Sequence, residues 1–296
     1  MILTRQCVGR TVLTGDIDDY PEGIVIPVDK PYRWTSADVI RKLKYCVCRH
    51  FHKKNLKVGH AGTLDPLATG VLLVCVGKAT RQAETFQKHD KEYVAGISFG
   101  ATTPSYDLEK EIDMRYPTDG VSEAALRFVL PGFLGEQEQV APLFSAKSID
   151  GVRAYELARK EWKRTRSAGD GGSASVFDHS AAGILNRQII NISEMELLGF
   201  WPDGLPASDV PVNPAEESDR RNLRINVTDN SSLHLPHAEV RVVCSKGTYI
   251  RALARDLGEA LGSGAHLDSL RRTRNGGFRV EDALTVEQAV DFFKFD

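Results

Sequence analysis

Residues 57–80 read KVGHAGTLDPLATGVLLVCVGKAT and contain the most informative pattern in the chain. The first half places one carboxylate, Asp65, among glycines and threonines, and the second half contains an apolar run at 71–76. Glycine lets the backbone approach a neighbour closely, and Pro66 fixes the chain just after the carboxylate. The short apolar run predicts a buried strand. The segment therefore predicts a constrained loop that holds an acid, although an aspartate in such a loop can also simply cap a turn.

The surrounding sequence alternates strand and helix patterns. Two segments have the spacing of a capping box, in which a hydroxyl and a side chain three residues later satisfy free backbone N–H groups at a helix start. They are Thr35 with Asp38 and Thr285 with Gln288. Side-chain alternation predicts strands at 93–99 and 239–244, and apolar residues every three or four positions predict a helix from Ile250 to Gly262. Strands dominate and helices are interspersed, so the expected fold class is α+β.

Composition limits the possible classes of protein. The chain has 296 residues, 42% of them hydrophobic, which is enough for a sizeable core. Five cysteines, with Cys75 and Cys244 inside apolar patterns, predict free thiols and a cytoplasmic location. The N-terminus has no signal-peptide pattern and no apolar run approaches 18 residues, so we expect no membrane association.

Basic residues are concentrated locally although the net charge is −2. Residues 39–64 contain no acidic side chain and seven lysines or arginines, and a second basic cluster follows at 271–279. A charge run is commonly a solvated face, but two such runs around a candidate active loop favour a track that contacts phosphates.

Two stretches interrupt the pattern. Residues 167–183 are rich in Gly, Ser and Ala, and residues 201–222 are rich in Pro, Asp and Glu. Both predict surface insertions between strands.

Four segments, in order, resemble the TruB-type tRNA pseudouridine synthases. They are KVGHAGTLDPLATGVLLVCVGKAT at 57–80, KEYV at 91–94, SKGTYIR at 245–251 and GAHLDSLRRTR at 264–274. The resemblance implies the pseudouridine synthase fold, a bent, mixed and mostly antiparallel sheet with flanking helices and a central active cleft. It implies one catalytic domain over 1–296, with a thumb-like insertion at about 140–187 and a surface insertion at about 201–236. The C-terminal RNA-binding PUA domain of many relatives is not apparent.

The resemblance also implies an activity and three catalytic residues. The expected enzyme is an isomerase that flips the T-loop uridine at position 55 of tRNA, breaks its glycosidic bond and rejoins the base through carbon 5. Asp65 resembles the family's nucleophile, and the pattern leaves open whether it attacks the ribose or the base. Arg251 resembles the arginine that pairs with this aspartate, and Tyr93 the tyrosine that stacks on the base and assists proton removal.

Five further residues are expected to contact RNA through the same resemblance. His60 resembles the histidine that takes up space in the RNA loop during flipping, and Tyr249 and Leu270 resemble the apolar floor of the pocket. Lys30 and Arg271 are expected to contact phosphates or the RNA loop.

The chain departs from the family pattern at 100–107, which reads GATTPSYD. Thr102 and Pro104 replace an arginine and an aspartate that many members carry, while Asp107 remains. Lys110 occupies a position that is usually glycine. We therefore expect a differently wired polar network behind the active site.

Substrate, cofactor and alternative functions complete the expectations. The T-arm stem-loop of tRNA is the expected partner of a monomer without an obligate protein partner, and an isomerisation needs no cofactor or metal. A zinc module is one alternative, because CVCRHFH at 46–52 has a cysteine or histidine at every second position. Paired zinc ligands usually have at least two residues between them, whereas here only one lies between neighbours. A non-catalytic RNA-binding or tRNA-folding chaperone is the other alternative. A degenerate member of this kind should have lost Asp65 or Arg251, and both are present.

Overall fold

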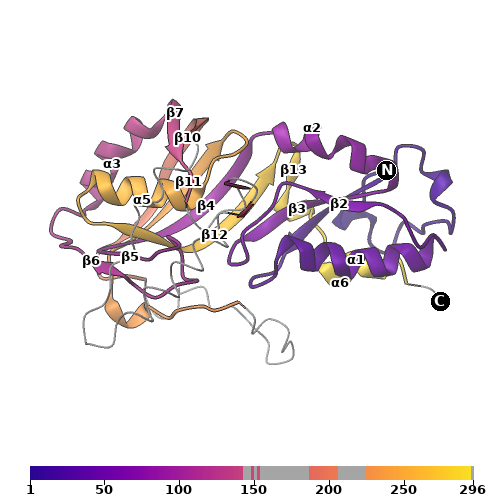
Figure 1. The fold of residues 1–296 in the computed structure, drawn as a ribbon, viewed down its shortest axis with the longest axis horizontal. Helices are drawn as coiled ribbons and strands as arrows, with labels where there is room; N and C mark the ends of the chain where they lie inside the picture. The colour runs from indigo at the N-terminus through magenta and orange to yellow at the C-terminus, as the bar shows by residue number, and fades with distance from the viewer. Residues whose placement is uncertain (143–147, 150–151, 154–186, 206–224, 295–296) are drawn as a thin grey trace. The chain divides into compact units, whose positions relative to one another are not determined.

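Figure 1 shows the computed structural model, which describes residues 1–142, 148–149, 152–153, 187–205 and 225–294. The helices are α1 (Ser36–His50), α2 (Ala83–Lys88), α3 (Glu123–Val129), α5 (Ile250–Ala260) and α6 (Val286–Asp291). The strands up to residue 140 are β1 (Ile24–Lys30), β2 (Val58–Ala61), β3 (Thr69–Val76), β4 (Lys91–Phe99), β5 (Ala101–Thr102), β6 (Met114–Arg115) and β7 (Gly135–Val140). The later strands are β8 (Ser148–Ile149), β9 (Val152–Arg153), β10 (Arg187–Trp201), β11 (His237–Cys244), β12 (Ala265–Asn275) and β13 (Phe278–Arg279).

The main sheet has the hydrogen-bonded strand order β1-β3-β12-β4-β11-β10-β7, with β2 beside β3 and β13 beside β12. The pairs β1–β3, β2–β3, β10–β11 and β10–β7 are antiparallel, and β12 lies parallel to β3. This mixed, mostly antiparallel sheet with interspersed helices confirms the predicted α+β class. The predicted bend and central cleft stay predictions.

The described residues form two compact units. The first unit contains residues 1–94 and 270–294, and the second contains residues 95–205 and 225–269 within the described ranges. Strands β4 and β12 contribute residues to both units. The thumb-like insertion and the surface insertion lie largely outside the described residues, so the single-domain prediction and both insertions stay predictions.

Strand β3 is the centre of the first unit. Its residues Val71 to Val76 are all fully buried, which explains why the sequence there is a continuous apolar run rather than an alternating one. On one face Val71, Leu73 and Cys75 join a cluster with Val25 and Val280. The other face carries the alternate residues, because successive side chains of a strand point to opposite faces.

Both predicted capping boxes are confirmed. The Thr35 hydroxyl accepts the Asp38 N–H and the Asp38 carboxylate accepts the Thr35 N–H, at the start of α1. Thr285 and Gln288 do the same for α6. Helices α1 and α6 contact each other within the first unit (Figure 1).

Three further predicted elements are confirmed, two of them longer and one shorter by two residues than predicted. Strand β4 begins at Lys91 rather than 93, β11 begins at His237 rather than 239, and α5 ends at Ala260. Residues 58–61 differ from the expected loop, because they form strand β2 against β3. Hydrogen bonding to a long apolar partner outweighs the low strand propensity of Gly59.

Candidate active site

The Asp65 loop, defined here as residues 62–68, connects β2 to β3 in the first unit. The Asp65 carbonyl accepts the Ala68 N–H at 3.1 Å, which closes a tight turn with Pro66 at its second position. Asp65 itself is half-buried. The loop therefore presents one carboxylate on a short turn directly before the central strand.

Ser36, the first residue of α1, holds the loop one residue before Asp65. Its buried hydroxyl accepts the Leu64 N–H at 2.9 Å and donates to the Leu64 carbonyl at 3.1 Å. One side chain thus satisfies both backbone groups of Leu64, and the capped start of α1 fixes where that side chain lies.

Lys30 holds the loop one residue after Asp65. Its ammonium donates to the carbonyls of Trp34 at 2.6 Å, Pro31 at 2.9 Å and Pro66 at 3.2 Å. The side chain is fully buried, and its three N–H donors point to backbone oxygens inside the protein. Lys30 therefore supports the loop, and its expected contact with RNA stays a prediction. Burial lowers the pKa of Lys30 to about 7, and the charge of Asp65 opposes this shift.

Arg272 on β12 contacts the first residue of the Asp65 loop and also strand β3, which follows the loop. Its Nε donates to the Val71 carbonyl at 2.7 Å and its Nη2 to the Gly62 carbonyl at 3.1 Å. Gly70 lies against the Arg272 backbone at a φ of +99°, and a Cβ there would come within 2.1 Å of the Arg272 carbonyl oxygen. Only glycine fits this close approach, which is the reason for the glycine that follows Thr69.

Arg271 makes a two-pronged ion pair with Asp29 on β1, with 2.8 Å between Nη2 and Oδ2. Asp29 also accepts the Gly70 N–H at 3.1 Å. Arg271 therefore supports the loop indirectly, while 43% of its side chain is exposed. Its expected contact with RNA stays a prediction.

His60, Tyr93 and Leu270 also lie in the first unit. His60 is on β2, and burial together with the charge of Arg272 lowers its pKa. The imidazole is therefore neutral near pH 7, which favours stacking against a base over binding a phosphate. Tyr93 is a largely buried residue of β4, and Leu270 is a half-buried residue of β12. Their roles stay predictions.

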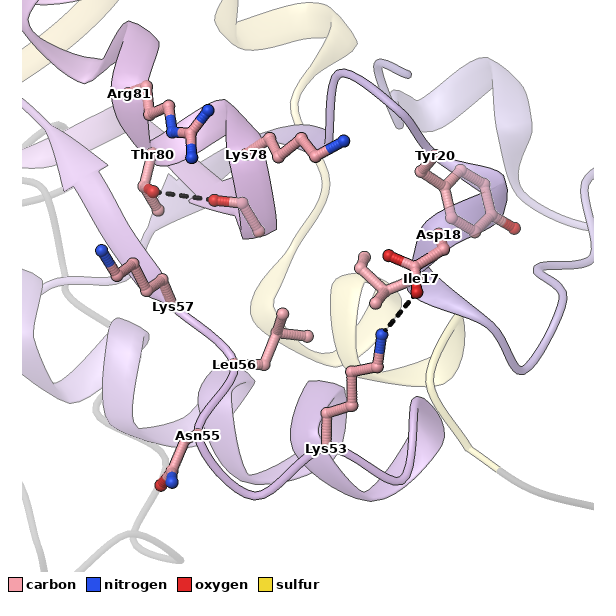
Figure 2. A pocket seen from close by; sticks show the side chains of 11 residues that line it. Ile17, Asp18, Tyr20, Lys53, Asn55, Leu56, Lys57, Lys78, Thr80 and Arg81 are labelled. Carbon is pink, nitrogen blue, oxygen red and sulfur yellow. Dashed lines mark hydrogen bonds and ion pairs between the residues drawn. The ribbon is translucent and has the colours of Figure 1, made fainter.

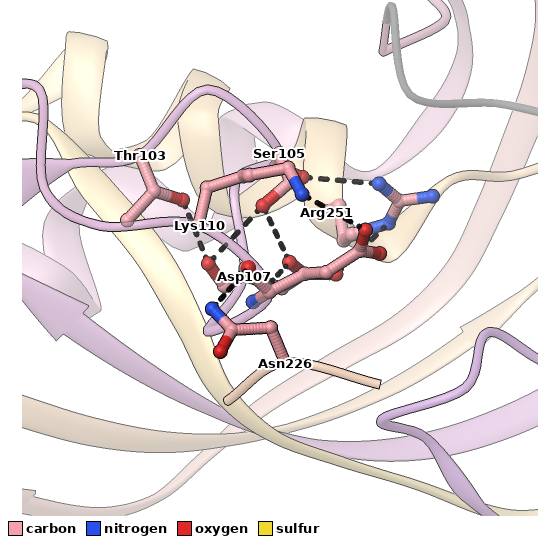
Figure 3. Close-up of polar contacts among 7 residues, drawn as sticks. Thr103, Ser105, Asp107, Lys110, Asn226 and Arg251 are labelled. Carbon is pink, nitrogen blue, oxygen red and sulfur yellow. Dashed lines mark hydrogen bonds and ion pairs between the residues drawn. The ribbon is translucent and has the colours of Figure 1, made fainter. Parts of the chain in front are cut away.

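Arg251 belongs to the second unit, in the first turn of α5 (Figure 3). Its Nη1 donates to the Ser105 carbonyl at 3.0 Å, and its Nε lies 3.8 Å from the Asp107 carboxylate. Asp107 in turn accepts the Ser105 hydroxyl at 2.6 Å and the Glu109 N–H at 2.9 Å. The buried guanidinium is thus held by an acid that is itself fixed by the following turn.

The residues at which the sequence departs from the expected pattern make polar contacts of their own. Thr102 donates to Asp113 at 2.7 Å, and Lys110 pairs with Glu109 at 3.2 Å. Asp107 contacts Arg251. The expectation of a differently wired network stays a prediction.

Tyr249 is the residue immediately before α5. Its backbone N–H donates to Gln139 at 2.8 Å, and its carbonyl accepts the Gln139 amide at 3.1 Å. Asp65 and Tyr93 belong to one unit and Arg251 and Tyr249 to the other. The predicted pairing of Asp65 with Arg251 stays a prediction.

The cysteine and histidine side chains of 46–52 make other contacts. The His50 ring bonds the Thr14 carbonyl at 2.9 Å and packs edge-on against Phe51, and the Cys48 thiol contacts the Lys54 carbonyl at 3.7 Å. Within the described ranges, no group of three or more His, Cys, Asp or Glu side chains is placed to hold a metal ion. No helix in the same ranges is both long and apolar enough to span a bilayer.

Sequence reasoning missed Ser36, Arg272 and Ser105 as parts of the site. The capping box at Thr35 predicted the place of Ser36 in α1, and the motif at 264–274 contains Arg272. Neither pattern indicates that a hydroxyl or a guanidinium turns inward to a loop far away in the chain.

Comparison with known proteins defines the class as a pseudouridylate synthase, an enzyme that isomerises uridine. The descriptions "TruB family pseudouridylate synthase (N terminal domain)" and "tRNA pseudouridylate synthase B C-terminal domain" match residues 49–170 and 251–295. The chain belongs to the TruB family of pseudouridylate synthases. No finding favours the non-catalytic alternative.

Curated relatives and solved structures agree with this family. The chain is 45% identical to tRNA pseudouridine synthase B of Phocaeicola vulgatus, over 91% of this chain and 92% of the relative. It is 46% identical to the protein of the same name from Bacteroides thetaiotaomicron, with the same coverage.

Two solved structures resemble the fold. One is a Cbf5-Nop10-Gar1 complex, with a TM-score of 0.56, 26% identity and coverage of 93% of this chain and 56% of that chain. The other is an H/ACA RNP bound to a substrate RNA containing 2'-deoxyuridine, with a TM-score of 0.52, 25% identity and coverage of 91% and 53%. The chain thus spans just over half the length of these two chains.

Proposed function

We propose that this enzyme converts a uridine of tRNA, the T-loop uridine at position 55, to pseudouridine. The observation that carries the proposal is the Asp65 loop, in which a single carboxylate is held between a residue fixed by Ser36 and a residue fixed by Lys30. Fixing a nucleophile before the substrate arrives removes an entropic cost from the chemical step. The shared name of the curated relatives supports tRNA as the substrate.

The proposed mechanism assigns one role to each predicted catalytic residue. The Asp65 carboxylate attacks the flipped nucleotide, and the bond between N1 of uracil and C1′ of ribose breaks. The base turns, C5 forms the new bond to C1′, and the bond to Asp65 breaks, which regenerates the carboxylate. The proton that C5 carried leaves to water with assistance from Tyr93, and the freed N1 takes up one proton. The product is therefore an isomer of uridine, and the reaction consumes no reagent.

Arg251 keeps Asp65 ionised and oriented in this proposal. A guanidinium offers parallel N–H donors that match a carboxylate. Its Nη1 and Nε already contact Ser105 and Asp107. The planar group is therefore oriented before it meets a second carboxylate, which lowers the entropic cost of that contact.

The test is the substitution Asp65→Asn, assayed by release of the C5 hydrogen from a uridine-labelled tRNA transcript and by mapping the modified position. The variant should bind tRNA and melt like the wild type while forming no pseudouridine. Asp90→Asn, at an exposed carboxylate of the same unit, is the matched control and should remain active. Turnover by Asp65→Asn near the rate of this control would refute the nucleophile role.

A further inference from the structure

A basic pocket of about 450 Å³ lies in the first unit, away from the Asp65 loop (Figure 2). The pocket is lined by residues of the N-terminal segment, of the turn before β2 and of the 3₁₀ helix after β3. Its cations are Lys53, Lys57, Lys78 and Arg81, and its one acid is Asp18. Four cations and one carboxylate give the pocket an excess of positive charge.

Most of this charge is not neutralised by the protein. Lys53 pairs with Asp18 at 2.8 Å, and this contact and the charge of Lys53 lower the pKa of Asp18. Lys57, Lys78 and Arg81 are exposed and make no ion pair or side-chain hydrogen bond with the described part of the chain. Figure 2 shows Lys57 and Arg81 on the side of the pocket opposite the Asp18–Lys53 pair. Three cations are thus available to an anionic ligand.

Hydrogen bonds and one buried side chain hold the backbone around the pocket in place. The Gly77 N–H donates to the Lys57 carbonyl at 2.8 Å, and the Thr80 hydroxyl donates to the Gly77 carbonyl at 2.7 Å. Ile17 is buried and packs beside Gly77. These contacts set the spacing between the backbone of Lys57 on one segment and the backbone of Lys78 on the other, so both cations are anchored beside the pocket before any ligand binds.

The distance between the pocket and the Asp65 loop indicates which part of a bound RNA could reach the pocket. The Asp65 loop precedes Thr69, the first residue of β3, and Gly77 follows Val76, the last residue. Eight strand residues rise by roughly 3.3 Å each, so the two ends of β3 lie roughly 23 Å apart. Consecutive phosphates of a helical strand are about 3.4 Å apart along the axis in DNA. A phosphate in the pocket therefore belongs to a nucleotide several positions away from the flipped uridine.

We propose that the basic pocket binds backbone phosphates of the tRNA outside the T-arm stem-loop that carries the target uridine, with Lys57, Lys78 and Arg81 as the contacting cations. Asp18 holds Lys53 in the free protein and competes with phosphate for it. The inference rests on the proposed function, since it requires tRNA as the substrate, and it adds a second RNA contact to that of the active site.

The test compares binding of a full-length unmodified tRNA transcript and of an isolated T-arm stem-loop over a range of salt concentrations. The variant is Lys78→Gln with Arg81→Gln, and the control is Arg127→Gln with Lys294→Gln, which removes two exposed charges that are already paired with Glu123 and Asp291. On full-length tRNA, losing two phosphate contacts should lower the slope of log K against log salt by about 1.4–1.8. The salt slope for binding of the isolated stem-loop and the rate of pseudouridine formation at saturating RNA should be the same in the variant as in the wild type.

A reciprocal variant, Asp18→Asn, should tighten tRNA binding several-fold, because it removes the nearer of the two carboxylates that hold Lys53 and leaves only Asp16, at 3.9 Å. Equal salt slopes for the Lys78/Arg81 variant and its control on full-length tRNA would overturn the proposal. An equal decrease of the salt slope for the isolated stem-loop would also overturn the proposal, because the contacted phosphates would then lie inside the T-arm. If inorganic phosphate raises the melting temperature of the wild type but not of the variant while tRNA binding is unchanged, the pocket takes a small phosphorylated ligand instead.

These outcomes are independent of catalysis, because they are read by direct binding. If the wild type binds tRNA but forms no pseudouridine, the proposed function fails while the salt slopes still decide the role of the pocket.

Discussion

The hydroxyl of Ser36 offers the most direct test of how the Asp65 loop is held, through the substitution Ser36→Ala. The hydroxyl makes two hydrogen bonds to Leu64, at 2.9 and 3.1 Å, and it is buried. Alanine removes both bonds without adding an atom, and it is a better helix former than serine, so α1 should not suffer. Any loss then reports on the loop.

The expected magnitude follows from the groups that are left behind. A buried N–H without a partner costs about 1–3 kcal/mol, and the Leu64 carbonyl loses its donor as well. We expect the free energy of unfolding to fall by about 2 kcal/mol. A misplacement of about 1 Å can cost roughly 100-fold in rate, so the single-turnover rate of pseudouridine formation should fall at least tenfold.

The assay pairs urea unfolding with single-turnover release of the C5 hydrogen. Ser263→Ala is the matched control, because Ser263 is buried in the second unit and makes one hydrogen bond, at 3.1 Å, to the Gly264 carbonyl. The control should lose about 1 kcal/mol of stability and keep the wild-type rate. If Ser36→Ala loses no more stability than the control and reacts at the wild-type rate, the loop is not held through this hydroxyl.

Three further predictions concern residues of the candidate site. Arg251→Lys keeps the charge but loses the planar fork, so the single-turnover rate should fall at least about tenfold, or roughly 1.4 kcal/mol, whereas an unchanged rate would show that charge alone suffices. Tyr93→Phe keeps the ring and removes the hydroxyl, so tRNA binding and melting temperature should persist while turnover collapses, and wild-type turnover would exclude a catalytic hydroxyl. Burial lowers the pKa of Lys30 from 10.5 to about 7. Between these pH values the unfolded chain carries a proton on Lys30 that the folded chain has lost. The free energy of unfolding should therefore rise from pH 7 to pH 9 by up to about 1.4 kcal/mol per pH unit. Urea unfolding of Lys30→Met should lack this rise, and equal slopes in both proteins would contradict the prediction.

Local patterns were sufficient where the structure depends on neighbouring residues. The capping boxes at Thr35 and Thr285 placed the starts of α1 and α6, because a cap is formed by residues three positions apart. The apolar run at 71–76 placed β3, because a strand buried on both faces needs no polar residue. The position of Asp65 before that strand follows from the same stretch of sequence.

The sequence alone, through these patterns and the family resemblance, determined the α+β class, the family and the identity of the candidate carboxylate. Only the tertiary structure decided what holds that carboxylate in place. The contacts of Leu64 with Ser36 and of Gly62 with Arg272 join residues 28 and 210 positions apart, and no local periodicity encodes such pairs. The burial of Lys30 could not be predicted for the same reason, because lysine is normally exposed, and only the folded chain brings together the three carbonyl oxygens that make its burial possible.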